Sequence, residues 1–243
     1  MALRHVSLFA GVGGFDLAAE WAGFETVLFV EKDPYCQKVL ARHWPGVPII
    51  DDIRSVNRES IDGPIDVLSG GFPCQPHSLL GKRKGVDDAR YLWPEMYRVI
   101  QGILPAWGVV ENVLGALYDG TFDTVCSDMA RAGYENSPPL VFPAATFGAP
   151  HIRYRVFLVS HLKGIGRRQG NKDAGGGREG TREAQERVRP ANGNRWPAAP
   201  DVLRVAHGVP SRVDRVKALG NAVVPQQAYP IFAAIAAVEG GRT

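Results

Sequence analysis

The chain has 243 residues and a formal net charge of +3, and 45% of its residues are hydrophobic while 22% are charged. This composition predicts one globular domain, or one domain with a small insertion. It excludes a membrane-spanning chain, because the longest apolar runs fall far short of the ~20 residues that a transmembrane helix needs. The charge is mild, so it permits nucleic-acid binding without arguing for it.

Residues 1 to about 160 alternate between strand-like and helix-like segments, a pattern that predicts a mostly parallel α/β sheet. Strands are expected at residues 5–9, 25–30, 47–50, 65–68, 107–111, 140–142 and 155–160. Helices are expected at residues 16–22, 34–43, 93–103 and 123–132. The last two strands are expected to close the set as a hairpin-like edge. Because the N-terminus leads directly into a strand, no signal peptide is expected.

Between residues 162 and 200 apolar side chains nearly vanish. Residues 163–195 hold nine Lys and Arg against four Asp and Glu, an excess of five positive charges. Two interpretations stay open: a solvated linker without fixed structure, or a nucleic-acid contact segment that orders on binding. Order is expected to return at residue 202, with a loop over residues 215–225 and a helix over residues 226–238 that packs back on the first block.

A single cysteine carries the clearest chemical indication in the chain. Cys74 lies in the run Gly70-Gly71-Phe72-Pro73-Cys74-Gln75-Pro76, directly after the strand expected at residues 65–68. Ligands and reactive groups of open α/β sheets gather at the carboxyl ends of such strands. Cys36 and Cys126 fall in expected helices and are interpreted as core thiols. Three widely spaced cysteines predict neither a disulfide framework nor a metal site, and a reducing cytoplasm is the default compartment.

Two further groups could act beside that thiol. Glu111 ends the apolar strand of the run Val109-Val110-Glu111, where burial would raise its pKa enough to let it donate a proton. A cysteine nucleophile and a carboxylic acid in one pocket suit attack on an electron-poor ring. Arg153 and Arg155 are expected to alternate along a strand and to point to one face. They form either a solvated edge or a pair that reaches a phosphate and a base.

The first expected strand ends in the glycine-rich run Phe9-Ala10-Gly11-Val12-Gly13-Gly14. It is either a plain tight turn or a loop whose backbone approaches a ligand. Glu31 follows the first glycine by 20 residues, the distance at which an acid meets a ribose hydroxyl in nucleotide-binding folds. The run lacks Gly-x-Gly-x-x-Gly, which disfavours a pyrophosphate and a nicotinamide-dependent oxidoreductase. S-adenosylmethionine, a nucleoside without phosphate, fits better, and Asp52 with its neighbours could contact the adenine.

These motifs resemble the DNA (cytosine-5) methyltransferase family over nearly the whole chain outside residues 162–200. The elements that carry the resemblance are Gly71-Phe72-Pro73-Cys74-Gln75, Glu111-Asn112-Val113, the pair Arg153 and Arg155, and Gly220-Asn221-Ala222-Val223-Val224-Pro225. The resemblance implies a Rossmann-like fold of S-adenosylmethionine-dependent methyltransferases, with a mostly parallel sheet, one antiparallel edge strand and a last helix beside the first. Residues 1–161 would form the catalytic domain, residues 162–200 a short target-recognition insertion, and residues 201–243 the returning segment.

The resemblance also implies roles for individual residues. Cys74 would add to C6 of cytosine, Glu111 would hold and protonate N3, and Arg153 and Arg155 would brace the base and its phosphate. The implied S-adenosylmethionine contacts are Phe9, Gly11, Gly13, Gly14, Glu31, Asp52, Ile53, Pro73, Leu92, Asn221 and Val223. The implied DNA contacts are Gln75, Ser78, Lys82, Arg83, Lys84, Arg167 and Arg168. No metal is implied.

The resulting expectation is an enzyme that methylates C5 of cytosine in double-stranded DNA, with the target base flipped out of the helix. It is expected to be a monomer in the cytoplasm of a bacterial host. The short insertion resembles that of members encoded by bacteriophages or prophages. Two alternatives stay open: an RNA (tRNA) cytosine-5 methyltransferase with the same chemistry, and a DNA-binding relative without turnover.

Overall fold

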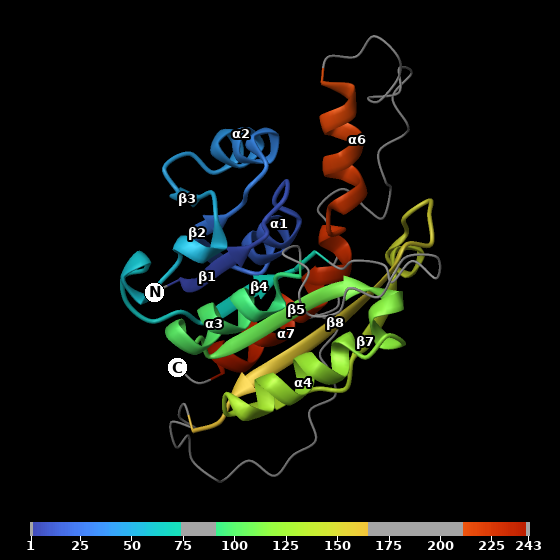
Figure 1. Cartoon of the computed structure of the whole chain (residues 1–243). Helices are drawn as coiled ribbons and strands as arrows, with labels where there is room; N and C mark the ends of the chain where they lie inside the picture. The colour runs from blue at the N-terminus through green and yellow to red at the C-terminus, as the bar shows by residue number, and fades with distance from the viewer. Residues whose placement is uncertain (1, 74–90, 165–210, 242–243) are drawn as a thin grey trace.

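The computed structural model describes residues 2–73, 91–164 and 211–241. Within them, eight strands form one sheet in the order β3-β2-β1-β4-β5-β8-β6, and β7 pairs with β8 beside β6 (Figure 1). The strands are β1 (Leu3–Leu8), β2 (Phe24–Val30), β3 (Ile49–Ile50), β4 (Val67–Gly70), β5 (Trp107–Val113), β6 (Tyr134–Asn136), β7 (Leu140–Pro143) and β8 (Tyr154–Leu162).

The sheet is mostly parallel, and its central strands are buried on both faces. All four residues of β4 are buried, and in β5 only the two ends are accessible. Such strands are near-continuous apolar runs. β8 runs antiparallel to β5, β6 and β7. The expected architecture is confirmed, with the difference that the antiparallel strand lies inside the sheet, because the short strands β6 and β7 extend the sheet beyond it.

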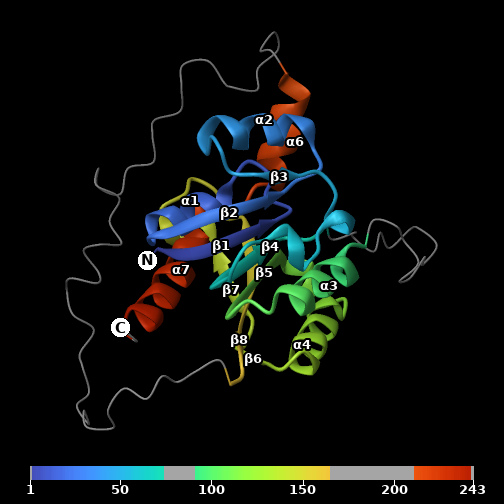
Figure 2. The same cartoon turned by 90° about the vertical axis from the view of Figure 1, so that its left-hand side faces the viewer.

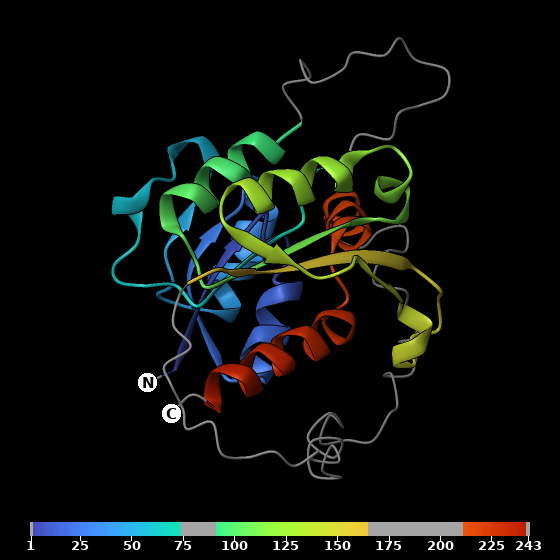
Figure 3. The ribbon, with the colours of Figure 1, turned by 90° about the horizontal axis from the view of Figure 1, so that it is seen from below.

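The helices of the described residues are α1 (Gly14–Trp21), α2 (Pro34–His43), α3 (Trp93–Ile103), α4 (Thr121–Arg131), α6 (Arg212–Asn221) and α7 (Pro225–Gly240), with short 3-10 turns at Ile53–Ser55, Arg58–Ser60, Leu114–Leu117 and Ala144–Phe147. Helices cover both faces of the sheet (Figure 3), and α6 projects away from it (Figure 1). α3 and α4 cover one face and share a core with β1, β4, β5 and β8. α1 and α7 cover the other face.

The last helix packs beside the first, as the resemblance implied. The Phe15 and Phe232 rings meet edge to face with centroids 6.1 Å apart, and Trp21 and Tyr229 meet in the same way. This contact returns the C-terminal segment to the sheet. Among the described residues, no helix combines the length and apolar character needed to cross a bilayer.

Local capping explains why α2 begins where the sequence predicts. Asp33 is its N-cap and accepts hydrogen bonds from the backbone N–H groups of Tyr35 and Cys36, while Pro34 takes the first helical position. Both features are typical of a helix start. α6 is different: the loop expected over residues 215–225 is wrong, because residues 212–221 are helical. The Gly220-Asn221 pair, interpreted as a turn within a loop, ends this helix instead.

A buried polar network lies beneath the first two strands. The Asp16 carboxylate accepts hydrogen bonds from the hydroxyls of Ser7 and Thr26, and His5 bridges the hydroxyls of Thr26 and Ser69. Burial raises the pKa of Asp16 to about 7 and lowers the pKa of His5 to about 3. Both side chains are therefore held neutral through much of the acidic range.

Asp16→Asn is expected to raise the free energy of unfolding at pH 8 more than at pH 5. The folded state holds the Asp16 proton until about pH 7, whereas an unfolded aspartate releases it near pH 4. Asp16 therefore stabilises the fold only at low pH, and this contribution is lost as pH rises from about 4 to about 7. Urea unfolding at both pH values measures the effect, which should reach a few kcal/mol at about 1.4 kcal/mol per pKa unit.

The contribution of His5 to stability has the opposite pH dependence, because it is lost as pH falls from about 6.5 towards about 3. This contribution is present in both the wild-type protein and Asp16→Asn, so it cancels in the comparison. Glu25→Gln is the matched control, because Glu25 is exposed on β2 beside Thr26. An equal effect of Asp16→Asn at the two pH values would contradict the assignment.

Candidate active site

The sheet topology brings the predicted site residues to one edge. Phe9, Glu31 and Asp52 follow the carboxyl ends of β1, β2 and β3, and the turn to Cys74 follows β4. β8 runs the other way, so its amino end lies at this same edge and brings Arg155 beside β5. Residues far apart in the sequence thereby converge where open α/β sheets place their ligands.

Glu111 and Arg155 form a buried ion pair at this edge. The Arg155 Nε lies 2.7 Å from the Glu111 Oε1, and both side chains are almost fully enclosed. Burial raises the pKa of Glu111 to about 7, and the positive charges of Arg155 and Arg153 oppose that rise. Near neutral pH the acid therefore exists in both protonation states, as a proton donor requires.

The turn that leads to the cysteine is packed against Glu111. A Cβ at Gly71 would overlap the Glu111 Oε2, so only glycine lets the carboxylate lie against this backbone. The next residue of β5, Asn112, donates from its Nδ2 to the Phe72 carbonyl at 3.2 Å in a buried site. Neither of these contacts, of Gly71 or of Asn112, was predicted from the sequence.

Cys74 itself lies outside the described residues, one position after Pro73. It lies three positions after Gly71, so their Cα atoms are at most about 11 Å apart. The other two thiols do not compete for its role. Cys36 is buried, which raises its pKa to about 12, and burial also raises the pKa of Cys126. Both are protonated at neutral pH and are therefore poor nucleophiles.

Arg153 lies outside the strand that carries Arg155. The expected alternation along one strand is wrong, because β8 begins at Tyr154 and Arg153 has a positive φ of 32°. Its Nη2 donates to the carbonyl oxygens of Gly220 and Ala222, at 2.8 and 2.6 Å. The two arginines thus have different hydrogen-bonding partners, although the positive charge of each acts on Glu111.

On the cofactor side, Glu31 holds the glycine-rich loop. Its two carboxylate oxygens accept hydrogen bonds from the backbone N–H groups of Gly11 and Asp33, each at 2.7 Å. A Cβ at Gly11 would meet no atom within 4 Å, so open space adjoins the loop there. An acid at the strand end, an approachable backbone and open space beside the loop fit a nucleoside such as that of S-adenosylmethionine.

The other two glycines of the loop are required for packing. A Cβ at Gly13 would overlap the ring of Trp44, and one at Gly14 would overlap the carbonyl oxygen of Val223. The glycine-rich loop therefore packs tightly between the end of α2 and the segment that precedes α7.

Asp52 lies after β3. Its carboxylate caps the 3-10 turn at Ile53–Ser55 by accepting a hydrogen bond from the backbone N–H of Arg54, and the Lys32 ammonium lies 3.7 Å from this carboxylate.

The remaining predicted cofactor residues lie around the glycine-rich loop. Ile53 is buried in the main core at 3% exposure, and Phe9 packs against the same core. Leu92 is the N-cap of α3, Pro73 is exposed, Asn221 ends α6, and Val223 packs against the core under α1 and α7. Of the predicted DNA contacts, Gln75, Ser78, Lys82, Arg83, Lys84, Arg167 and Arg168 all lie outside the described residues.

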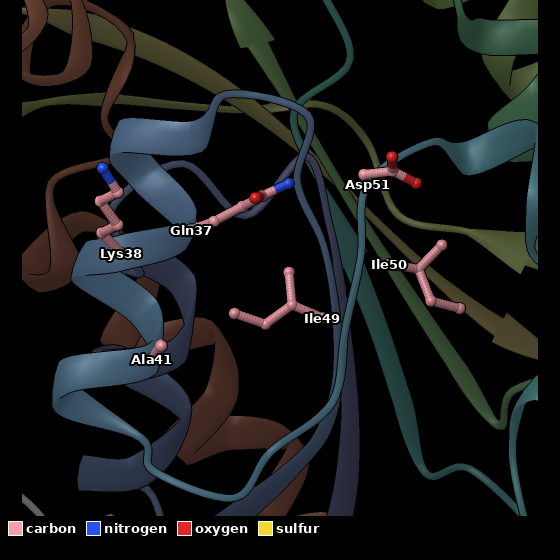
Figure 4. A pocket seen from close by; sticks show the side chains of 6 residues that line it. All are labelled: Gln37, Lys38, Ala41, Ile49, Ile50 and Asp51. Atoms are coloured by element: carbon pink, nitrogen blue, oxygen red, sulfur yellow. The ribbon is translucent and has the colours of Figure 1, made fainter.

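An open pocket of about 580 Å³ lies at the outer edge of the sheet, between α2 and β3 (Figure 4). Its lining comes from Gln37, Lys38 and Ala41 on the helix and from residues 49–51. It adjoins the cofactor side, because Gln37 donates to the Glu31 carbonyl. Neither the glycine-rich loop nor Glu111 lines this pocket, so the site is defined by the strand ends instead. The described residues contain no cluster of metal-ligating side chains.

Fold and site together define a class of protein: an α/β domain of the Rossmann-like, S-adenosylmethionine-dependent methyltransferase type, with a buried acid beside a cysteine turn. The profile of the C-5 cytosine-specific DNA methylase family matches residues 3–194. The chain therefore belongs to the C-5 cytosine-specific DNA methylase family.

Curated relatives agree with this assignment. The type II methyltransferase M.AquIA of Picosynechococcus sp. is 37% identical over 183 residues, which are 68% of this chain and 74% of that protein. M.PspPI of Psychrobacter sp. is 40% identical over 159 residues, 63% of this chain. The chain spans 38% of the length of M.PspPI and 52% of that of M.NgoMIV from Neisseria gonorrhoeae. The activity of the whole protein is therefore a matter of proposal.

Solved structures share the fold. A prophage-encoded E. coli protein assigned as a DNA modification methyltransferase superposes with a TM-score of 0.58 at 31% identity, over 67% of this chain and 47% of that one. The S. pombe Dnmt2 methyltransferase superposes with a TM-score of 0.57 over 70% of this chain and 57% of that one. Its identity is 20%, so this likeness shows the fold alone.

Proposed function

We propose that this protein transfers a methyl group from S-adenosylmethionine to C5 of cytosine in double-stranded DNA. The observation that carries the proposal is the position of Glu111: a buried acid with a pKa of about 7 lies against Gly71, three residues before Cys74. A thiol and a proton donor at one strand edge are what addition to a pyrimidine ring requires. The family, shown on independent grounds, supports the same reaction.

Each residue has a defined part in this reaction. The Cys74 thiolate adds to C6 of the base, which raises the electron density at C5. Glu111 donates a proton to N3 and so stabilises the adduct. C5 then takes the methyl group from the bound donor, which leaves as S-adenosylhomocysteine. Loss of the C5 proton to a base expels the Cys74 thiolate, and N3 returns its proton to Glu111. Arg155 holds the Glu111 carboxyl in place before the base arrives.

We further propose that the glycine-rich loop, Glu31, Asp52 and the Asn221 segment hold the donor. Open space at Gly11 and the two backbone hydrogen bonds of Glu31 support this placement. The target base is inaccessible in a duplex, so it would be flipped out. The basic segment 162–200 would be the target-recognition region. Basic residues in this segment and at residues 82–84 would contact phosphates. The protein would act as a monomer in the cytoplasm of a bacterial host, and a restriction–modification role follows the type II relatives.

A transfer assay tests this proposal. Purified protein with labelled S-adenosylmethionine is expected to label duplex DNA and to leave tRNA unlabelled, while Cys74→Ala is expected to label neither. Label confined to tRNA would replace the DNA substrate by an RNA one. Equal labelling of DNA by Cys74→Ala and wild-type protein would reject the assigned nucleophile.

A further inference from the structure

We propose that Arg153 is a positioning residue that links the start of β8 to the segment between α6 and α7 on the cofactor side. Its loss weakens binding of the methyl donor rather than binding of DNA. This inference rests on the proposed function. It assigns Arg153 a task different from bracing the base and its phosphate.

The side chain of Arg153 caps the C-terminus of α6. Gly220 lies in the last turn of that helix, and Ala222 is its C-cap, so their carbonyls lack partners within the helix. The Arg153 Nη2 donates a hydrogen bond to each of these two carbonyls. A cation at this end of a helix is favourable, and hydrogen bonds from an ionised donor are stronger than neutral ones.

The backbone of Arg153 is held as firmly as its side chain. Its carbonyl accepts hydrogen bonds from the Ala144 N–H at 3.3 Å and from the Gln227 Nε2 at 3.0 Å. Gln227 is fully buried on α7 and also donates to Phe142 at the end of β7. A non-glycine residue at φ 32° persists only where its surroundings hold it. Arg153 is thus fixed between β8, α6 and α7.

The segment that Arg153 holds is itself pressed on the glycine-rich loop. Val223, directly after Ala222, contacts Gly14 so closely that a Cβ there would overlap its carbonyl oxygen. Earlier in α6, the Lys217 Nζ lies 2.6 Å from the Asp33 Oδ2 at the N-cap of α2, and Figure 2 shows α6 beside α2. Lys217 is 62% exposed, and exposed pairs contribute little. The partly buried Arg153 contact is therefore the main tie.

The consequence is a connection between two parts of the site. Arg155, two residues along, pairs with Glu111 on the base side. Arg153 holds the loop on the donor side through Gly220 and Ala222. Without the Arg153 guanidinium, the carbonyls of Gly220 and Ala222 lose these two hydrogen bonds, and the segment between α6 and α7 is held less firmly against Gly14. The glycine-rich loop then loses its fixed position, while Glu111 and Arg155 keep theirs.

Amide hydrogen exchange of residues 220–224 in the cofactor-free protein tests this contact directly. Arg153→Gln is expected to speed exchange there about tenfold or more, and Arg153→Lys, which keeps a charged donor, should lie between it and wild type. Arg131→Gln is the control, because Arg131 is an exposed arginine on α4. Unchanged exchange in Arg153→Gln would overturn the proposal. If Arg153→Gln does not fold, Arg153→Lys is compared with wild type instead. Exchange rates and donor affinity that both equal those of wild type would then overturn the proposal.

Kinetics and titration separate this role from a phosphate contact. Arg153→Gln is expected to raise the Kd for S-adenosylhomocysteine and the KM for S-adenosylmethionine about tenfold, with the KM for DNA within about threefold of wild type. A lost phosphate contact would instead reduce the salt dependence of DNA binding by about one unit of slope and leave the donor unaffected. Failure of wild-type protein to bind the donor would reject the proposed function, while the exchange result would still decide the tie.

Discussion

Glu111→Gln is expected to lower kcat for methyl transfer by about 100- to 10,000-fold, the range that a lost general acid removes. Glutamine keeps the size of the side chain and an oxygen that can accept from the Arg155 Nε, but it has no proton to give to N3. The donor should bind with unchanged affinity, because Glu111 pairs with Arg155 and lies against Gly71, whereas Glu31 forms the hydrogen bond to the glycine-rich loop. Single-turnover methylation measures the first effect and titration with S-adenosylhomocysteine the second.

The pH dependence of residual activity sharpens this expectation. With the pKa of Glu111 raised to about 7 by burial, the wild-type rate should fall above that pH as the acid loses its proton. The variant should lack this decline. Glu135→Gln, at an exposed acid on β6 with 72% of its side chain accessible, should behave as wild type. Activity within threefold of wild type in Glu111→Gln would remove the acid from the mechanism.

Gly14→Ala is expected to destabilise the protein by about 2 to 4 kcal/mol and to weaken donor binding at least tenfold. The added Cβ would overlap the carbonyl oxygen of Val223, and a backbone atom cannot move aside as the end of a side chain can. Inserting a methyl group into such a site forces a backbone shift, which costs about 1–3 kcal/mol and sometimes more. The segment before α7 must therefore shift, and the glycine-rich loop packed against it must shift as well. Thermal unfolding and calorimetric titration measure the two effects.

Gly102→Ala is the matched control, because this glycine lies within α3 and a Cβ there would meet nothing within 4 Å. Alanine in a helix interior should be stabilising by about 0.5–1 kcal/mol. The interpretation of Gly14 would be refuted by a Gly14→Ala protein that unfolds at the same temperature as Gly102→Ala and binds the donor equally well.

The strength of the local indications decided which elements could be predicted. α2 and α3 begin and end where the sequence indicates, because each carries a proline in its first turn, and α2 also carries an Asp33 cap. α6 was missed because its sequence is polar and ends in Gly220-Asn221, a pair that is equally typical of a turn. β6 has three residues, too few for an alternating pattern. It exists because β8 offers it an edge.

The candidate site divides in the same way. Residue types and their order predicted Glu111, Glu31 and the turn to Cys74, because strand ends in a parallel sheet share one edge. The partners could not be predicted. The pairing of Arg155 with Glu111 depends on the antiparallel register, in which Val113 lies opposite Arg155. The cap that Arg153 places on α6 depends on a helix that the sequence did not indicate, and the anchor at Gln227 depends on how α7 returns to β7.

The central claim is that Cys74 bonds to C6 of a cytosine while Glu111 protonates the ring. Duplex DNA containing 5-fluorocytosine tests it most directly, because the fluorine that replaces the C5 hydrogen prevents release of the enzyme. With S-adenosylmethionine present, we expect a complex that survives denaturation, with the modified peptide containing Cys74, and no such complex from Cys74→Ala. Fluorinated DNA that is bound but never covalently held, or a bond at Cys36 or Cys126, would contradict the account.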